Sequence, residues 1–573
     1  MKRCPQCNRV ETDDSLVFCR MDGASLLNDS LPVPGEAGTA RLGSTATEIE
    51  TSILPQATDA NMPRSTGPTT VQPPPTTPIS TRELTKPKRS WIAILLVVLV
   101  AATACVGAYF YFTRKTSYTI QSIAVMPFVN ESGNPEIEYL SDGMTETLIS
   151  SLSQLPNLNV KPRSSVFRYK GKETDPRTIA KELDVQAILN GRVVQRGQDI
   201  SLFVELIDIS LDKVVWSETY NRKQSDLVTL QTDIAREVSG KIKTKLSGTD
   251  VAKVTKTYTT NPDAYQHYLK GNFYRTKYTE EGYQKSIEYY QKAIAIDPNY
   301  ALAYHGIAAA YDYANGYYLT PNESEPKAKA AALKALELDD TLTETHFLLG
   351  KIVFWYEWDW ATAERHWKRA NELDSTYPAD YPVYLAATGR FDEAVKAQEA
   401  VLQRLPLDLN MNLDSAGILL LAGRYDQSIE QTRKALELDP NFWWAYQNLG
   451  LAYERKKQYA EAIAALEKAR QGDVNPSSLG YLGYVYAAAG KKAEALRVLD
   501  ELKESSKRQY VPSYSIAIIY AGLNDKDKAF EWLNKAYDER SHFIALLKVE
   551  TVLDNLRPDP RFAELMRKVG LPQ

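Results

Sequence analysis

A spacing between small residues repeats through the C-terminal part of this 573-residue chain. Gly450, Ala462 and Ala469 stand 12 and then 7 positions apart. The same two intervals recur in three further sets, which are Ala416, Ser428 and Ala435; Gly483, Ala495 and Leu502; and Ala517, Ala529 and Ala536. Self-similarity at this period indicates stacked copies of one supersecondary unit. This region is therefore expected to fold as a row of neighbouring units and not around one central core.

Less regular units precede these four. They centre on Gly271, Ser286 and Ala293; on Ala308, Ala328 and Ala335, with a long loop over Leu319–Pro326; on Gly350, Ala363 and Ala370; and on a shortened unit, Arg390–Leu405. About eight units are expected between Pro262 and Tyr537. The pattern resembles the tetratricopeptide repeat (TPR). That resemblance implies pairs of antiparallel helices touching at the small positions, and an all-α TPR superhelix with a C-terminal cap over residues 261–573.

The TPR resemblance also implies a concave surface formed by the first helix of each unit. Side chains placed there by register are the expected partner-binding residues, namely Tyr265, Tyr268, Asn272, Arg275, His305, Phe347, Lys351, Trp444, Gln447, Arg455 and Tyr484. Tyr, Trp and Arg dominate protein interfaces. An alternative interpretation is that aromatic residues at helical spacing belong to the core. A protein or an extended peptide is the expected ligand, and no small-molecule substrate is expected.

A different periodicity covers residues 118–247. A short apolar strand at Ser122–Phe128 precedes an amphipathic helix, and a β-hairpin turns at Arg196–Asp199 before a last helix over Leu227–Ile242. The runs SIAVMPFVNESGNPEIEYLSDGM and LFVELIDISLDKVVWSETY resemble the TolB N-terminal-like domain. The resemblance implies an α/β interaction domain, commonly periplasmic, without established catalysis. Asp142 and Glu146 lie near a helix start, where the helix dipole favours acidic side chains.

The segment 91–112 contains 22 residues without a charge. At about 1.5 Å per residue, a helix of that length spans the ~30 Å hydrocarbon core of a bilayer. Arg82, Lys86, Lys88 and Arg89 precede it. The positive-inside rule then predicts a single-pass inner-membrane protein with a cytosolic N-terminus and periplasmic or extracytoplasmic C-terminal domains. A buried core helix is the alternative.

Residues 28–90 form a Pro/Thr-rich stretch between two more apolar segments. Ten prolines fall between Leu31 and Lys88, and no aromatic residue occurs from Ala24 to Ser90. Such a composition cannot bury enough apolar surface to offset the entropy of ordering, so a disordered linker is expected.

The first 27 residues contain three of the four cysteines of the chain. Cys4-x-x-Cys7 and Cys19-x-x-Asp22 have the spacing of two halves of a tetrahedral zinc site, with a carboxylate in place of the fourth thiolate. The segment resembles short zinc-ribbon modules at the N-termini of bacterial proteins. The expected cofactor is therefore one structural zinc ion held by Cys4, Cys7, Cys19 and Asp22. A degenerate knuckle without metal is the alternative.

Composition restricts the functions open to the whole chain. Net charge is 68 − 72 = −4, which gives no general attraction to nucleic acid. Only five histidines occur, and neither a Gly-rich phosphate loop nor the catalytic motifs of a kinase are found. We therefore expect a non-enzymatic, membrane-anchored scaffold or signalling receptor. The alternatives are a transcription-associated regulator that uses the zinc ribbon, and an accessory subunit of an enzyme complex.

The zinc site can be tested on the isolated N-terminal segment. Native mass spectrometry at neutral pH, with all three thiols reduced, should find one zinc ion per chain, because three thiolates and one carboxylate at this spacing can bind a tetrahedral zinc ion. A spectrum with only the metal-free mass would contradict the assignment.

Overall fold

The computed structural model describes residues 120–242, 246–374, 381–472 and 476–571. It also describes three short strands near the N-terminus, β1 (Lys2–Arg3), β2 (Val10–Glu11) and β3 (Leu27–Asn28), which pair antiparallel in the order β2-β1-β3. Residues 1–116 and 117–573 are separate units. The expected zinc ligands Cys4, Cys7, Cys19 and Asp22 and most of the linker 28–90 lie outside the described residues, so these two assignments stay predictions.

The prediction of a single-pass membrane protein is contradicted. Across the described parts of the chain, no helix has both the length and the apolar composition that a membrane crossing requires. The longest of these helices, α10 (Pro321–Leu338), has 18 residues and contains several charged side chains. The segment 91–112, on which the prediction was based, lies outside the described residues.

The second unit begins with an α/β module built on a mixed sheet. The strands β4 (Ser122–Val125), β6 (Asn159–Val160), β7 (Ala187–Arg196), β8 (Asp199–Asp208) and β9 (Lys213–Lys223) lie in the order β6-β4-β7-β8-β9, and β5 (Val129–Asn130) also pairs with β7. Strands β4, β5, β6 and β7 pair parallel, whereas β7, β8 and β9 form an antiparallel meander. The predicted hairpin is confirmed, because β7 and β8 pair from Ala187–Asp208 to Arg196–Asp199.

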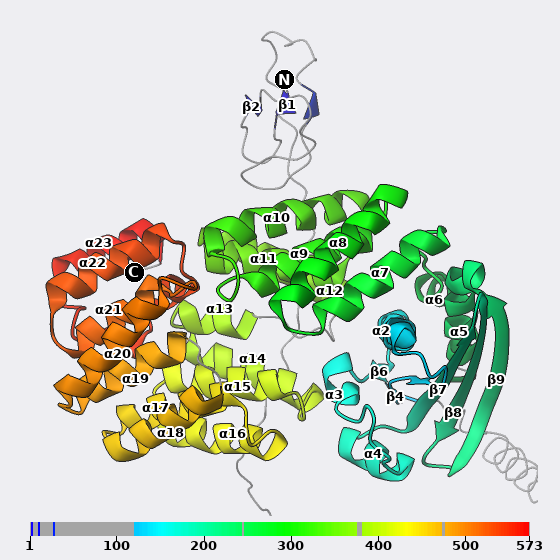
Figure 1. Cartoon of the computed structure of the whole chain (residues 1–573), viewed down its shortest axis with the longest axis horizontal. Helices are drawn as coiled ribbons and strands as arrows, with labels where there is room; N and C mark the ends of the chain where they lie inside the picture. Colours follow the sequence, from blue (N-terminus) through cyan, green and yellow to red (C-terminus); the bar gives the residue numbers. More distant parts are fainter. Residues whose placement is uncertain are drawn as a thin grey trace, which may run out of the picture. The chain divides into compact units, whose positions relative to one another are not determined.

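Two long helices cover one face of this sheet. They are α2 (Glu138–Ser153) and α5 (Leu227–Ile242), which Figure 1 shows on the same side of the strands. Alternate residues of β8 from Ile200 to Leu206 point into their shared core and are fully buried. Three short helices complete the module: α3 (Arg163–Phe167), α4 (Pro176–Leu183) and α6 (Gly248–Val254).

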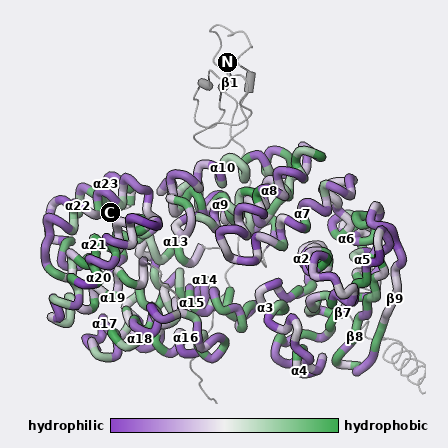
Figure 2. The backbone as a smooth tube through the Cα atoms, viewed as in Figure 1, coloured by the Kyte–Doolittle hydropathy of each residue, from purple (hydrophilic) through white to green (hydrophobic). Residues whose placement is uncertain are grey.

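The next sixteen α-helices of the described residues, α7 to α22, form eight antiparallel pairs. The pairs are α7 (Pro262–Arg275) with α8 (Glu280–Ile296); α9 (Ala301–Ala314) with α10; α11 (Thr343–Ile352) with α12 (Trp360–Leu373); α13 (Tyr381–Ala387) with α14 (Phe391–Arg404); α15 (Leu409–Leu421) with α16 (Tyr425–Leu438); α17 (Trp443–Arg455) with α18 (Tyr459–Gly472); α19 (Pro476–Ala488) with α20 (Lys492–Ser505); and α21 (Ser513–Gly522) with α22 (Lys526–Asp538). Hydrophilic and hydrophobic stretches alternate along these helices, as Figure 2 shows, which is the pattern of amphipathic helices.

The repeated small residues lie where the helices of each pair touch. The alanines at these positions, such as Ala416, Ala462 and Ala529, are fully buried. A Cβ atom added at Gly450 would lie 2.4 Å from Leu466 Cγ, and one added at Gly271 would lie 2.4 Å from the Tyr290 ring. The spacing of 12 and 7 is therefore a packing requirement of the helix pair.

The second pair differs from the sequence-based expectation of a loop over Leu319–Pro326. Helix α10 begins at Pro321, so Pro326 lies inside the helix. The physical reason is a capping box, in which the backbone N–H of Thr320 donates to Glu323 Oε2 at 3.0 Å and the Thr320 side chain caps the helix in return. Proline at the first helical position adds to this start signal.

The chain ends in a cap on the last pair. Two short 3₁₀ turns, η4 (His542–Leu546) and η5 (Thr551–Leu553), precede α23 (Pro560–Val569), which lies along α22. In the third pair, a π-helical turn, η3 (Val353–Glu357), extends α11. Trp358 and Trp367 are buried beside it, so the tryptophans of this region pack in the core.

Two glycine substitutions test the close packing of the pairs. Gly450→Ala should lower the free energy of unfolding by about 1–3 kcal/mol, because the new methyl group meets Leu466. Gly417→Ala, in α15, should raise it by about 0.4–1 kcal/mol, because a Cβ atom there meets nothing within 4 Å and alanine restricts the unfolded chain. Urea unfolding followed by circular dichroism measures both. Equal destabilisation by the two changes would contradict this packing.

Candidate functional site

The α/β module and the first repeat pair share one hydrophobic core. Gly143, in the middle of α2, faces Leu269 of α7, and a Cβ atom added at Gly143 would lie 2.8 Å from Leu269 Cδ2. Real Cβ atoms do not approach so closely, so the glycine lets the two helices come together. Leu269 belongs to the same buried cluster as Met144 and Leu148 of α2. We call this contact between α2 and α7 the joint.

Two of the expected partner-binding tyrosines lie in the joint. The Tyr265 hydroxyl donates a hydrogen bond to Gln231 Oε1 at 2.6 Å and lies 3.3 Å from Thr147 Oγ1. Burial raises the pKa of the Tyr265 phenol, so the group stays protonated and able to donate. The Tyr268 ring packs 5.1 Å from the ring of Tyr300. Tyr265 therefore links α7 to the module, whereas Tyr268 packs within the repeats.

A carboxylate of α2 lies between two arginines at the edge of the joint. Glu146 Oε1 is 3.4 Å from Arg275 Nη2, and Glu146 Oε2 is 3.9 Å from Arg163 Nε. The Arg163 guanidinium also lies 3.8 Å from the centroid of the Phe167 ring. The single carboxylate of Glu146 therefore interacts with two arginines, one from the module and one from α7.

The module contacts the repeats at a second point, on the fifth pair. Ser164 Oγ donates to Asp408 Oδ2 at 2.7 Å, and Asp408 is also the N-cap of α15. Leu407 packs against the core of the module. The module therefore bridges the inner side of the repeats from α7 to α15.

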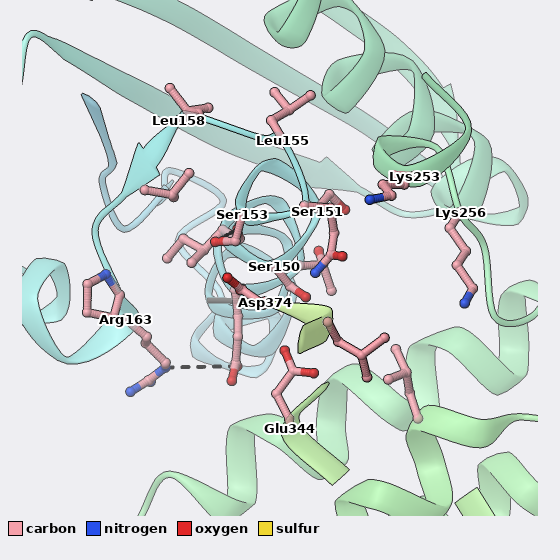
Figure 3. A pocket seen from close by; sticks show the side chains of 18 of the residues that line it. Ser150, Ser151, Ser153, Leu155, Leu158, Arg163, Lys253, Lys256, Glu344 and Asp374 are labelled. Atoms are coloured by element: carbon pink, nitrogen blue, oxygen red, sulfur yellow. Dashed lines mark hydrogen bonds and ion pairs between the residues drawn. The ribbon is translucent and has the colours of Figure 1, made fainter. Parts of the chain in front are cut away.

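A cavity of about 1520 Å³ lies between these two contacts. One wall comes from the α/β module and includes Ser150, Ser151, Gln154, Arg163 and Lys253; the other comes from first helices of the repeats and includes Asn272, His305, Glu344, Phe347 and Met411. Figure 3 shows the serines of α2 facing Glu344 and Asp374 across this space, with Lys253 and Lys256 to one side. The cavity exceeds the roughly 300–1,000 Å³ of ordinary small-molecule sites.

Six of the eleven predicted partner-binding residues line this cavity. They are Tyr265, Tyr268, Asn272, Arg275, His305 and Phe347. His305 Nδ1 lies 3.0 Å from Thr345 Oγ1. Burial, helped by the charge of Arg275, lowers the pKa of His305 to about 4. The imidazole is therefore neutral at pH 7 and offers hydrogen bonds without charge.

The acidic side of the cavity contains a carboxyl group that resists ionisation. Burial raises the pKa of Glu344, and the charge of Asp374 raises it further. On the lysine side, Lys256 Nζ is 2.6 Å from Asp339 Oδ2. Lys256 is therefore already paired with a carboxylate, whereas burial disfavours the charged form of Glu344.

The other five predicted residues lie away from this cavity. Lys351 donates to Asp312 at 2.9 Å, and Gln447 accepts from Ser478 Oγ at 2.8 Å. Trp444 packs beside the small cluster of Leu413, Ala435 and Ala445. Arg455 and Tyr484 lie against the chain's own C-terminal segment.

The cavity-lining residues of the module were not predicted from the sequence. Ser150, Ser151, Gln154, Arg163 and Lys253 acquire this place only because the module docks onto α7 and α15. The available signal was Gly143, a glycine inside an otherwise amphipathic helix, which indicates a close helix contact.

The two acidic residues that the sequence places near the start of α2 are both engaged in ion pairs. Asp142 forms an ion pair with Lys170, and Glu146 forms ion pairs with two arginines. Within the described residues, no group of three or more His, Cys, Asp or Glu side chains is placed to hold a metal ion.

Family models match both parts of the second unit. Residues 278–300, 384–441 and 432–464 match three tetratricopeptide repeat models, so the chain is a TPR protein in its C-terminal region, and this fold is typical of non-enzymatic interaction scaffolds. Residues 119–237 match the model described as HilA/YgeH-like transcriptional regulator, second domain. The expected TolB N-terminal-like assignment is not shown by this match.

Individual proteins resemble parts of the chain. A putative adenylate cyclase 3 of Rhizobium meliloti is 28% identical over 41% of this chain, and the TPR repeat-containing protein YpiA of Bacillus subtilis is 25% identical over 26%. The matches span 40% and 36% of those proteins' own lengths. Among solved structures, YrrB, a TPR protein with an unusual peptide-binding site, is 21% identical with a TM-score of 0.23, and matches 32% of this chain and 93% of YrrB.

The joint can be tested by removing one hydroxyl group. Tyr265→Phe should lower the free energy of unfolding by about 1–2 kcal/mol, because Gln231 and Thr147 lose a buried partner. Tyr304→Phe is the matched control, because that hydroxyl makes no hydrogen bond to any described residue, and its effect should stay within about 0.5 kcal/mol. Urea unfolding measures both, and an equal loss in the two variants would count against the joint.

Proposed function

We propose that this chain is a non-enzymatic scaffold that takes an extended segment of a partner protein into the cavity between α2 and the inner face of the repeats. The observation that carries the proposal is the cavity itself, whose walls include six residues placed on the inner face by repeat register. TPR repeats are interaction modules, which supports a protein as the partner.

The chemistry of the walls supports a polypeptide segment over a small ligand. Serines of α2 and the neutral His305 and Asn272 supply donors and acceptors that suit main-chain groups. Phe347, Leu348 and Met411 supply apolar surface on the repeat side. Arg275 and Lys256 already have carboxylate partners, so charge contributes less than hydrogen bonding and shape.

A second candidate function is regulatory. It is favoured by the match of residues 119–237 to a domain of transcriptional regulators and by the similarity to a putative adenylate cyclase. In that role the bound segment would belong to a transcription complex or a cyclase. The identity of the captured protein separates this candidate from a general scaffold.

The proposal is tested by filling the cavity. Ala309 lines the cavity and is half-buried, so Ala309→Trp places an indole group in the path of a bound segment. We expect at least a tenfold loss of partner captured by a photo-crosslinking amino acid at position 150, and mass spectrometry of the captured protein identifies its class.

The matched control is Ala464→Trp, at an exposed position on the outer helix α18. It should leave crosslinking unchanged. Undiminished crosslinking in Ala309→Trp, with circular dichroism like that of the unmodified chain, would refute the cavity as the binding site.

A further inference from the structure

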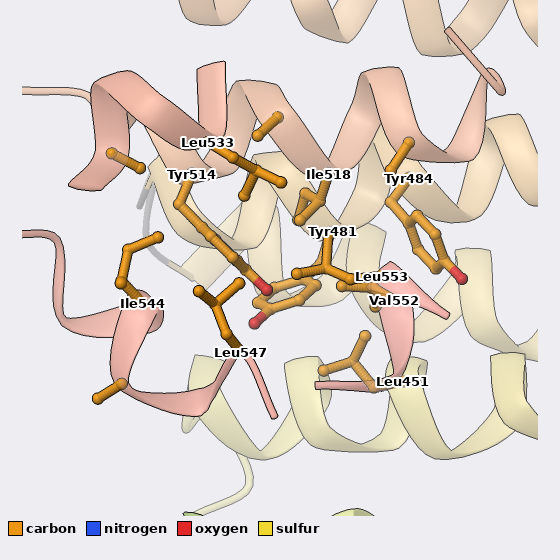
Figure 4. Close-up of a cluster of buried hydrophobic side chains, with 14 of the residues drawn as sticks. Leu451, Tyr481, Tyr484, Tyr514, Ile518, Leu533, Ile544, Leu547, Val552 and Leu553 are labelled. Atoms are coloured by element: carbon orange, nitrogen blue, oxygen red, sulfur yellow. The ribbon is translucent and has the colours of Figure 1, made fainter. Parts of the chain in front are cut away.

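The segment between the last repeat and the cap crosses the inner face of the repeats. From Ser541 to Leu556 the chain forms only the two short turns η4 and η5, and we call this stretch the return segment. Its residues Leu547, Val552 and Leu553 are buried in one cluster with Leu451 of α17 and Tyr514 of α21, as Figure 4 shows. The return segment thus lies on first helices of the sixth to eighth pairs, where register places ligand-facing side chains.

Side chains of the repeat helices contact both the main chain and the side chains of the return segment. Arg455 Nη1 donates to the main-chain carbonyl of Thr551 at 2.9 Å, and Arg455 Nη2 lies 3.4 Å from Asp554 Oδ2. Tyr481 of α19 faces the Glu550 carboxyl. Recognition combines a main-chain group, two acidic side chains and aliphatic anchors.

Hydrogen bonding across this contact is incomplete. Glu454 Oε2 and Arg455 Nε lie 3.7 Å apart as an ion pair, but the Tyr514 hydroxyl and Ser541 Oγ are buried and have no hydrogen-bond partner among the described residues. Each such group offsets part of the gain from apolar burial, since an unpaired buried donor or acceptor costs about 1–3 kcal/mol. The hydrophobic cores of native proteins leave few buried polar groups without a hydrogen bond. At this contact, unpaired hydroxyl groups therefore offset part of the gain from apolar burial.

We propose that the inner face of α17, α19 and α21 is a second peptide-binding site, that the return segment is its tethered ligand, and that a partner segment of the same chemistry displaces it. The displacing ligand carries two adjacent aliphatic side chains flanked by carboxylates, as in Glu550-Thr-Val-Leu-Asp554. The cap helix α23 has contacts of its own with α22, because Phe562 and Leu565 are buried in one cluster with Phe530 and Arg561 lies 2.8 Å from Asp527. This site is separate from the cavity beside α2.

Occupancy of this site should depend on pH through Glu550. Burial raises the pKa of Glu550 to about 7. The titratable and charged groups that face it are Tyr481, Tyr484, Tyr514, Arg455, Arg557 and Asp554. In the docked segment the Glu550 carboxyl group holds a proton up to about pH 7. In a free segment the same carboxyl group has a pKa near 4.5 and releases that proton. Docking is therefore stronger below pH 7 and weakens above it, by about tenfold between pH 6 and pH 8.

A peptide with the sequence of residues 541–557, labelled with fluorescein, tests the site in the full chain. Val552→Asp should weaken docking of the return segment, because it places a charge among buried aliphatic side chains. We expect this variant to bind the peptide at least tenfold more tightly than the unmodified chain, and Arg455→Ala in the same variant to abolish the gain. Leu496→Asp, at an exposed position of α20, is the matched control and should bind like the unmodified chain. Equal peptide affinity in Val552→Asp and the unmodified chain would overturn the proposal.

Hydrogen exchange on the unmodified chain keeps the test independent of how that variant folds. Amides of residues 542–556 should exchange at least tenfold faster than those of α21, and faster at pH 8 than at pH 6 after correction for intrinsic rates. Exchange of the return segment at the same rate as α21 would show that it opens only when the repeats unfold, and would refute the tethered ligand.

Discussion

The absence of a side chain at Gly143 allows the contact on which the rest of the second unit depends. Because α2 has no Cβ atom at this position, Leu269 of α7 can pack directly against its backbone. The joint buries Tyr265 and Leu269 together with the core of the α/β module, so the module and the first repeat form one hydrophobic cluster. Together with the hydrogen bond from Ser164 to Asp408, this approach places the module opposite the repeats, so the cavity has two walls.

This arrangement divides the inner face of the repeats into two parts with different surroundings. The first pairs face the α/β module across a cavity, whereas the sixth to eighth pairs are covered by the return segment. A TPR inner face that stood alone would present one continuous groove. Here two elements from outside the repeats, one before them and one after them, determine which inner-face side chains remain accessible.

The repeats could be predicted from the sequence because their packing requirement is local. A small residue at Gly450 or Ala462 is needed wherever two helices touch, so the intervals of 12 and 7 persist while other positions vary. The hairpin of the α/β module was predictable for the same reason, since Ile200 to Leu206 alternate in burial. The loop before α10 is shorter than the predicted Leu319–Pro326, because the capping box at Thr320 starts the helix at Pro321.

The candidate site was only half predictable because long-range docking leaves little local trace. Register assigned Asn272, His305 and Phe347 to first helices of the repeats, and the structure places them along one wall of the cavity. It could not show that Ser150 and Arg163, more than 100 residues away in sequence, form the opposite wall. Nor could register show that Arg455 donates a hydrogen bond to the carbonyl of Thr551, because the return segment has no repeat pattern of its own.

The two inner-face sites also differ in the kind of ligand that each can select. In the cavity, Arg275 and Lys256 are already paired with carboxylates, and His305 is neutral, so a ligand gains little from its charge and must fit through shape and hydrogen bonds. At the return segment, Arg455 reaches both a carbonyl and a carboxylate, and burial raises the pKa of Glu550 to about 7. Selection there depends on acidic side chains and on pH, so ligands of the two sites need not compete even though both lie on the same row of helices.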